Sequence, residues 1–247
     1  MGNIKVTITY DGTNYHGFQE QRGTGLKTIQ GVLEERIQQI AATPIPVIGA
    51  GRTDTGVHAR GQVISFSGDG WPVPLVRTVY ALNSVLPRDI AAVAAEEQPD
   101  SFHPRYSAKA KTYRYTIYNG KWPSPLHRLY SYHVPQQLDL KGMQQAALLL
   151  EGEKDFSTFR ALGTPVKTTV RLMYRIEVTR TDGFVHISLC ANGFLYHMAR
   201  LIAGTLLRVG LGKITPGEVE GIQKGNSRFT SGPSLPARGL CLEEVEY

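Results

Sequence analysis

The sequence predicts an α+β protein with largely antiparallel sheets, and three observations lead to this fold class. Segments with alternating apolar residues, which are typical of half-buried strands, recur along the 247 residues. They are mixed with longer stretches in which apolar residues follow helical spacing. Several strand-like segments follow one another without a helix between them, as in antiparallel hairpins, and this disfavours a doubly wound parallel sheet.

The first half of the chain begins with a strand in which Ile4, Val6 and Ile8 alternate with polar residues. An apolar stripe at helical spacing then runs from Ile29 to Ala41 and ends before Pro44, which a helix does not tolerate in its interior. Further strands are expected over residues 47–50, 62–66 and 90–95, with a helix over 75–86.

The second half contains more strand than helix. Strands are expected over residues 111–118, 129–134, 168–180, 184–190 and 239–246, and a helix over 194–209. Another helix is predicted to begin after Asp139, because Asp is a favoured N-cap residue and helically spaced apolar residues follow it. Within 168–180, the period-two spacing of Leu172, Tyr174 and Ile176 predicts that they share one face.

Each half runs from strand to helix to further strands, so we predict two similar subdomains. Residues 1–105 form the N-terminal one, which carries the loop around Asp54, and residues 106–247 form the C-terminal one. A cleft between two sheets would suit a long, charged ligand.

The chain carries a net charge of +6 and has a pI of about 9.3. A pI above about 9 is typical of nucleic-acid binders, although a merely basic enzyme fits equally well. The two cysteines, Cys190 and Cys241, are not in a CxxC pair, so neither a zinc finger nor a disulfide framework is indicated. No apolar run approaches the roughly 20 residues that span a bilayer, and the N-terminus reads as a strand, so a cytoplasmic protein is expected.

The stretch GAGRTDTGVHARGQ, residues 49–62, combines Asp54 with glycines, threonines, arginines and a histidine. The spacing of Gly51 and Gly56 matches a phosphate-binding loop, but Val57-His58 stands where that motif has Lys-Ser/Thr. Asp54 and His58 are possible metal ligands, yet no HExxH motif or carboxylate cluster accompanies them. We therefore predict no metal.

Two interpretations of Asp54 remain level. In the first it is a turn residue, because Asp side chains commonly stabilise turns. In the second it is a catalytic carboxylate kept ionised by neighbouring arginines such as Arg52, since a nearby positive charge favours the charged form. An ionised Asp can act as a nucleophile.

Six motifs along the chain resemble, in order, those of the TruA family of tRNA pseudouridine synthases. They are YDGTNYHGFQEQ with TIQGVLE, GAGRTDTGVHARGQV, FHPRYSAKAKTYRYTIYN, DFSTFR, NGFLYHMARLIAGTLLRVGLGK and GPSLPARGLCL. Three residues depart from the family pattern: Thr55 replaces Ala, Leu201 replaces a frequent Asn, and Tyr196 occupies a position that is often basic.

This resemblance implies isomerisation of uridine to pseudouridine at positions 38, 39 and 40 of the tRNA anticodon stem-loop, without a cofactor. It makes Asp54 the essential carboxylate, or nucleophile, and Arg200 the arginine that pairs with it. Tyr113 would stack on the target uracil, and Arg52 would fill the space left by the flipped base or contact the backbone. The resemblance also implies two ferredoxin-like halves with sheets joined around a basic central cleft, and a homodimer.

Basic residues gather around the stacking tyrosine. Arg105, Lys109 and Lys111 are candidate phosphate contacts, and alternation sends the two lysines to the same side as Tyr113 and sends Arg114 to the other. Such interleaving of aromatic and basic groups suits RNA.

Two other functions compete with the synthase. One is a non-catalytic protein of the same fold that binds structured RNA, and the other is a metal-dependent RNA hydrolase. Release of hydrogen from C5 of uridine, in excess chelator, distinguishes the synthase from both.

Overall fold

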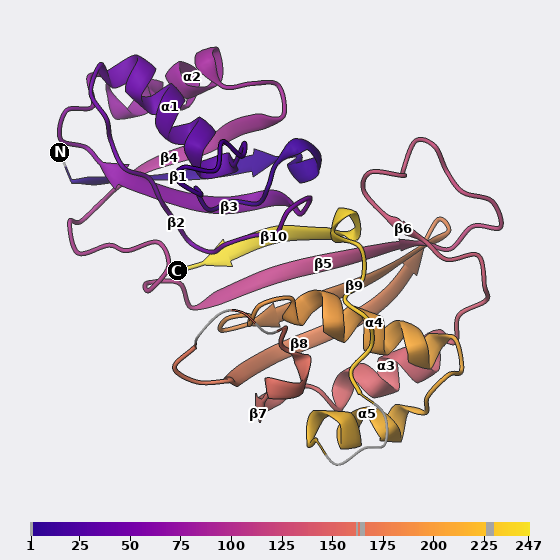
Figure 1. The fold of residues 1–247 in the computed structure, drawn as a ribbon. Helices are drawn as coiled ribbons and strands as arrows, with labels where there is room; N and C mark the ends of the chain where they lie inside the picture. The colour runs from indigo at the N-terminus through magenta and orange to yellow at the C-terminus, as the bar shows by residue number, and fades with distance from the viewer. Residues whose placement is uncertain (1, 162, 164–165, 226–229) are drawn as a thin grey trace. The chain divides into compact units, whose positions relative to one another are not determined.

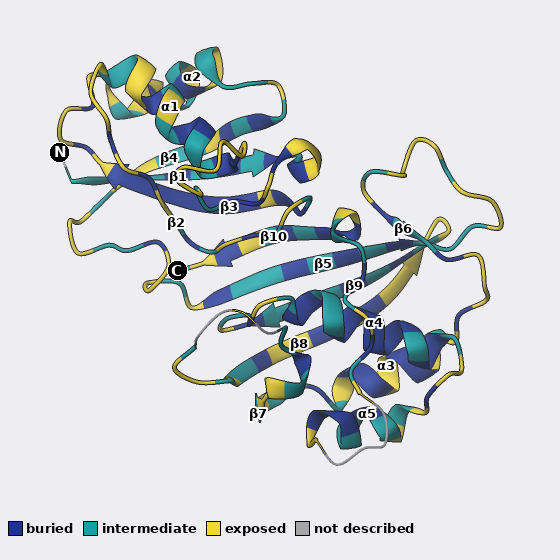
Figure 2. Ribbon diagram, in the orientation of Figure 1, coloured by how far each residue is buried: buried dark blue, intermediate teal, exposed yellow. Residues whose placement is uncertain are grey.

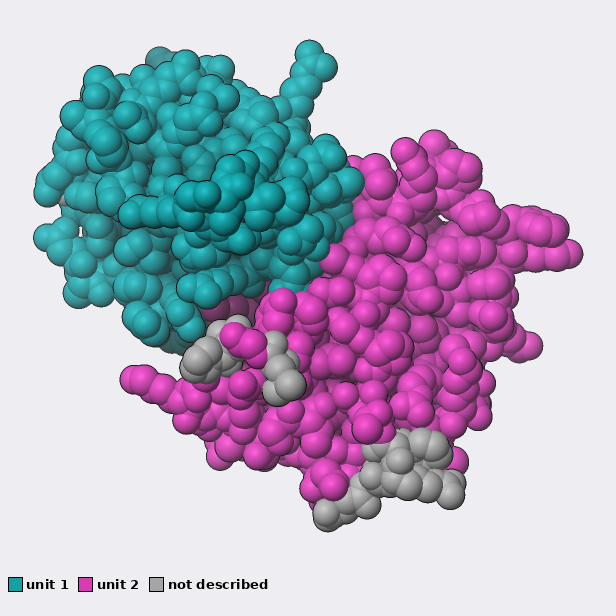
Figure 3. Space-filling view, in the orientation of Figure 1, with its two compact units in different colours: residues 1–109, 242–247 teal, residues 110–241 magenta. Residues whose placement is uncertain are grey.

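The computed structural model describes residues 2–161, 163, 166–225 and 230–247. The chain divides into two compact units, shown in two colours in Figure 3. Unit 1 consists of residues 1–109 and 242–247, and unit 2 of residues 110–241. The sequence-based division lies after residue 105, whereas in the structure the first unit extends to residue 109. Residues 242–247 at the end of the chain also belong to unit 1.

Unit 1 is built on an antiparallel sheet with helices packed against it (Figure 1). Its elements are β1 (Asn3–Tyr10), α1 (Ile29–Ala41), β2 (Ile48–Gly49), β3 (His58–Ser67), α2 (Leu75–Val85) and β4 (Ile90–Gln98). The strand order is β4-β1-β3, with β2 on β3, and β10 (Leu240–Glu246) follows β3. The order strand–helix–strand–strand–helix–strand is the ferredoxin-like arrangement.

The first helix begins and ends where the sequence indicates. The Thr28 hydroxyl oxygen caps α1 by accepting the backbone N–H of Gly31 at 3.2 Å. Ala42 follows the helix in the left-handed conformation, with φ 58°, and Pro44 comes two residues later. Figure 2 shows the apolar stripe of this helix as buried, while its other side is exposed.

Unit 2 also combines antiparallel strands with helices. Its elements are β5 (Ala110–Tyr118), β6 (Tyr132–His133), α3 (Leu140–Leu148), β7 (Gly152–Asp155), β8 (Val170–Thr181), β9 (Phe184–Ala191), α4 (Met198–Gly210) and α5 (Pro216–Gln223). The strand order is β5-β9-β8-β7, antiparallel throughout, with the short β6 running parallel to β5. The predicted α+β class with mainly antiparallel sheets is therefore confirmed.

Local structure in unit 2 differs from the sequence prediction at the start of α4 and in the middle of β8. Helix α4 begins at Met198 and not at Phe194, because His197 adopts the left-handed conformation with φ 61°. In β8 the pairing register shifts between Met173 and Arg175. This bulge reverses the alternation, so Met173 is buried and Tyr174 is exposed, and the prediction that Tyr174 shares a face with Ile176 is wrong.

Strand β7 and helix α5 are absent from the elements expected from the sequence. A recognisable signal marks α5: Thr215 and Glu218 form a capping box, and Pro216 occupies the first turn. Within the described part of the chain, no helix has the length and apolar character needed to cross a membrane.

Candidate active site

Asp54 lies in unit 1, in the turn between β2 and β3, and the residue before it fixes the turn. Thr53 is only 6% exposed. Its hydroxyl lies 2.8 Å from the Tyr10 hydroxyl at the end of β1, and its carbonyl accepts the Phe18 N–H at 3.0 Å. The last residue of β1 thus holds the side chain of Thr53, and the segment that follows β1 holds its backbone.

The turn is closed by main-chain groups. The Asp54 carbonyl accepts the Val57 N–H at 3.1 Å, and Gly56, with φ 77°, donates its N–H to the Tyr15 carbonyl at 3.3 Å. This closing bond uses the backbone carbonyl of Asp54, a group that any residue supplies.

Two glycines let the segment after β1 approach this turn closely. Gly17 has φ 88°, and a Cβ placed on it would lie 2.8 Å from the Thr53 carbonyl oxygen. A Cβ on Gly12 would collide with the Val57 carbonyl. Because a side chain does not fit at either point, the motif YDGTNYHGF and the Asp54 turn form one packed structure.

His58 is enclosed by the segment after β1. It is the first residue of β3 and is buried, and its Nδ1 lies 3.1 Å from Asp11 Oδ1 and accepts the Gly12 N–H at 3.1 Å. Among the described residues, no group of three or more His, Cys, Asp or Glu side chains is placed to hold a metal ion. The residues of this loop thus do not provide a metal-binding set.

The basic candidates of unit 1 occupy its surface. Arg52, Arg105 and Lys109 are exposed. Thr53 is buried and Asp54 is half-buried. The Lys109 N–H donates to the Glu246 carbonyl at 2.8 Å, which fixes the backbone there. Arg60, the second arginine of the loop motif, lies 3.6 Å from Glu243.

Tyr113 lies in unit 2, on β5 opposite Leu189 of β9, and is 7% exposed. Tyr113, Tyr115 and Ile117 are all buried, so the alternation along this strand places them on one face. The Phe194 ring packs edge-on against Tyr113, with ring centroids 4.9 Å apart. Lys111, on the same strand, is half-buried.

Arg200 also lies in unit 2, in the first turn of α4, and is anchored by two groups that the sequence analysis did not single out. Its Nε donates to the Leu235 carbonyl at 2.7 Å, and its Nη1 lies 3.2 Å from His197 Nε2. His197 Nδ1 in turn lies 3.2 Å from the Ser234 hydroxyl. His197 and Ser234 fall within the motifs NGFLYHMAR and GPSLPARG, and that is the signal by which they could have been found.

The charge of Arg200 acts on a neighbouring tyrosine. Burial raises the pKa of the Tyr115 hydroxyl well above its usual value, and the positive charges of Arg200 and Arg238 oppose that rise. The Tyr115 hydroxyl stays protonated and donates to the Pro236 carbonyl at 2.8 Å. The segment after α4 is thereby tied to β5, close to Arg200.

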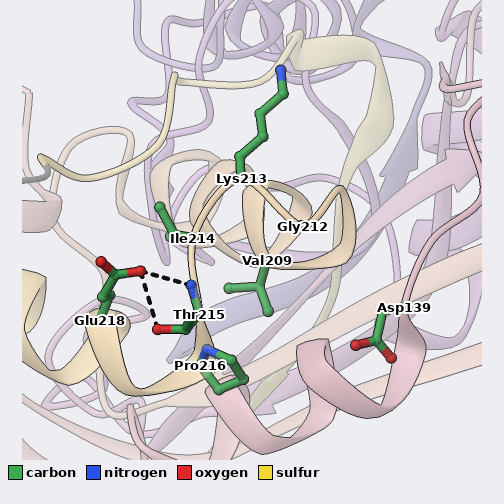
Figure 4. A pocket seen from close by; sticks show the side chains of 8 residues that line it. All are labelled: Asp139, Val209, Gly212, Lys213, Ile214, Thr215, Pro216 and Glu218. Atoms are coloured by element: carbon green, nitrogen blue, oxygen red, sulfur yellow. Dashed lines mark hydrogen bonds between the residues drawn. The ribbon is translucent and has the colours of Figure 1, made fainter.

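A surface pocket of about 330 Å³ lies elsewhere in unit 2 (Figure 4). It is lined by Asp139, Val209, Gly212, Lys213, Ile214, Thr215, Pro216 and Glu218. Two of these residues form the capping box, in which Glu218 accepts from the Thr215 N–H at 2.8 Å and lies 3.0 Å from the Thr215 hydroxyl. None of the predicted site residues lines this pocket, and its polar groups serve the helix ends.

Comparison with known proteins defines the class of enzyme. A family model described as tRNA pseudouridine synthase matches residues 6–107 and 146–247, which include the Asp54 turn in unit 1 and Arg200 in unit 2. Enzymes of this class are isomerases. A chain of a solved Cbf5–Nop10–Gar1 complex aligns with 82% of this chain and 54% of its own, at a TM-score of 0.34 and 14% identity, a likeness too low to carry a conclusion.

Curated relatives match from end to end. The chain is 46% identical to tRNA pseudouridine synthase A of Moorella thermoacetica and 45% identical to that of Acetivibrio thermocellus, with 100% of both chains covered in each case. It is 44% identical to the enzyme of the same name from Bacillus licheniformis, over 99% of this chain and 98% of the relative. The chain belongs to the tRNA pseudouridine synthase A family.

Proposed function

We propose that this protein isomerises uridine to pseudouridine at positions 38, 39 and 40 of the tRNA anticodon stem-loop, with Asp54 as the essential carboxylate and without a cofactor. The observation that carries the proposal is the construction of the Asp54 turn. Tyr10, Phe18 and two glycines hold its backbone, so that a single carboxylate is presented from a rigid support. A catalytic group needs such support because small displacements are costly in rate.

The reaction requires few other functional groups from the protein. The bond between C1′ and N1 breaks, the uracil turns, and C5 bonds to C1′. The hydrogen on C5 is released to water, and N1 takes up a proton, so the reaction consumes neither oxidant nor reductant. The Asp54 carboxylate has three available roles: it attacks the sugar, attacks the base, or removes a sugar proton to give a glycal. Each role requires an ionised oxygen beside the ribose.

The target base must leave its stack first, at a cost of about a few kcal/mol. In the proposal, Arg52 fills the vacated space or contacts the backbone, since its exposed guanidinium belongs to the same turn as Asp54. Tyr113 stacks on the uracil, and Arg200 pairs with Asp54. The bonds of Arg200 to Leu235 and His197 support this role, because they orient its guanidinium.

Binding of tRNA rests on the positive charge of the chain, which is +6. Arg105, Lys109 and Lys111 neutralise backbone phosphates in this proposal. The enzyme works in the cytoplasm, where its substrate is found.

The protein acts as a homodimer in this proposal. An apolar surface supports it: the segment between β5 and β6 carries Trp122 and Leu126, and Leu126 is 84% exposed. Burial of such side chains between copies stabilises an oligomer. Sedimentation of the parent protein and of Leu126→Asp tests this point, and a parent that remains monomeric at micromolar concentration contradicts it.

The deciding experiment uses tRNA transcribed with uridine tritiated at C5. The parent protein should release tritium to water in excess chelator and with no added cofactor. Asp54→Asn keeps the side-chain shape and removes the charge, so it should fold and bind tRNA but release no tritium. Binding without release by the parent protein would indicate a non-catalytic RNA-binding protein. Substantial release by folded Asp54→Asn would show that Asp54 is only a turn residue.

A further inference from the structure

The segment between β4 and β5 presents an aromatic ring to solvent. Tyr106 is 76% exposed, although most large aromatic side chains of unit 1 are buried. The ring does not stand alone: the His103 ring packs against it with centroids 4.3 Å apart and an interplanar angle of 34°. The guanidinium carbon of Arg105 lies 5.7 Å from the Tyr106 centroid.

The His103 ring is fixed by the backbone of the same turn. Its Nδ1 accepts the N–H groups of Arg105 and Tyr106 at 3.2 and 3.3 Å. The His103 carbonyl accepts the N–H groups of Tyr106 and Ser107, and the Ser107 hydroxyl accepts the His103 N–H at 3.2 Å. Because Nδ1 is an acceptor in this arrangement, a neutral ring carries its proton on Nε2. The imidazole thus forms a fixed backing for Tyr106.

The turn is also anchored to the rest of unit 1. The Tyr247 ring packs on Phe102 with centroids 5.1 Å apart, and the Tyr247 hydroxyl donates to the Pro104 carbonyl at 2.8 Å. Burial raises the pKa of Tyr247 far above its usual value, so this donor stays protonated. The Asn3 side-chain amide donates to the Phe102 carbonyl at 3.3 Å. The exposed ring of Tyr106 therefore stands on a rigid base.

The charge of the segment between β4 and β5 indicates which kind of ligand the Tyr106 ring contacts. Residues 101–109 contain Arg105 and Lys109 and no acidic residue. An exposed, oriented aromatic ring beside cationic groups matches the chemistry of an unpaired nucleotide, in which a base presents a flat face and a phosphate carries negative charge.

We propose that Tyr106, backed by His103, is a stacking platform for an unpaired base of the RNA substrate, and that Arg105 neutralises a phosphate of the same strand. This inference rests on the proposed function, because it takes tRNA as the ligand. Tyr106 is distinct from Tyr113, which the proposed mechanism assigns to the target uracil. His103 is a positioning residue, since it acts through the orientation of Tyr106.

The test is the affinity for unmodified tRNA transcript, measured by filter binding. Loss of stacking on one base should raise Kd by roughly 5- to 150-fold in Tyr106→Leu. Tyr106→Phe keeps the ring and should stay within about twofold of the parent. Tyr80→Leu is the matched control, because Tyr80 is a similarly exposed tyrosine of unit 1, on α2, and should bind as the parent does. Each variant must keep the parent's melting temperature.

Arg105 and His103 provide independent readouts. Arg105→Ala should reduce the salt dependence of binding by about one phosphate contact. His103→Ala should weaken binding, and His103→Asn should recover part of the loss because its side-chain oxygen can accept the same backbone N–H groups. A destabilised turn alone would lower the melting temperature of both variants without this rescue of affinity.

The inference fails if Tyr106→Leu binds tRNA as tightly as the parent protein. It also fails if Tyr106→Leu changes the sedimentation coefficient and leaves Kd unchanged, because the surface then serves a second copy of the chain. Tritium release by the parent protein separates this failure from failure of the proposed function. If the parent protein binds tRNA through Tyr106 but releases no tritium, the stacking platform is supported and the proposed isomerase activity is contradicted.

Discussion

The Tyr10 hydroxyl lies 2.8 Å from the hydroxyl of Thr53, the residue before Asp54, and both side chains are buried. This bond joins the end of β1 to the Asp54 turn. Removal of a buried hydrogen-bonding group costs about 1–3 kcal/mol. The contact therefore affects both the stability of unit 1 and the position of the carboxylate.

Tyr10→Phe should lower the free energy of unfolding by about 1–3 kcal/mol, because Thr53 loses its buried partner. The single-turnover rate of tritium release should fall, while Kd for tRNA stays near the parent value. Chemical denaturation and rapid-quench kinetics measure the two effects. Tyr174→Phe, an exposed tyrosine on β8, is the control, and equal rates for Tyr10→Phe and the parent would contradict the positioning role.

Gly17→Ala should displace the Asp54 turn. Its φ of 88° is unfavourable for Ala by roughly 1–2 kcal/mol, and the new Cβ would in addition lie 2.8 Å from the Thr53 carbonyl oxygen. Gly25→Ala is the matched control, since Gly25 has φ 69° and no atom within 4 Å of an added Cβ. Both variants should lose stability, and only Gly17→Ala should also lose turnover. Similar turnover in the two variants would mean that the close approach is unimportant.

Tyr113→Phe should retain tRNA binding and lose turnover if the hydroxyl assists proton handling at the uracil. Tyr113→Leu should be slower still, because stacking is worth about 1–3 kcal/mol per base. Tyr118→Phe, on the same strand, controls for general effects on β5. Tyr113 is buried against Phe194, so parent-like rates in both Tyr113 variants would identify it as a core residue.

Arg200→Lys should abolish most turnover even though the charge is kept. A lysine has one nitrogen and does not reproduce the simultaneous bonds to Leu235 and His197 that orient the guanidinium. Arg208→Lys is the control, because Arg208 lies on the same helix and donates to the Thr230 carbonyl at 2.9 Å. Full activity of Arg200→Lys in single-turnover assays would rule out a role that depends on guanidinium geometry.

The affinity for tRNA should fall steeply with salt, because bound phosphates release counterions. Replacement of Lys109 or Lys111 by Ala should each flatten the log–log slope by about one contact. Lys213→Ala, in the pocket of Figure 4, should leave the slope unchanged. A slope near zero for the parent protein would contradict broad phosphate binding.

The sequence by itself determined the fold class, most elements and the family. Alternation in β1 and in residues 113–118 of β5 is a local signal that the structure retains, and so are caps such as Thr28 and Asp139. The Asp139 side chain accepts the Gly142 N–H at 3.1 Å, as an N-cap does. The motif around Asp54 was also visible. The residues by themselves support the turn interpretation and the catalytic interpretation of Asp54 equally. The catalytic role of Asp54 stays a prediction.

Only the tertiary structure decided the features that depend on distant partners. The bulge at Tyr174 arises from pairing with β9, and the late start of α4 follows from the left-handed backbone of His197, whose ring lies between Ser234 and Arg200. The bond between Tyr10 and Thr53 joins residues 43 positions apart. Periodicity reports which residues are apolar along one element, but it contains no information about which buried polar groups become partners, because that depends on how separate elements pack.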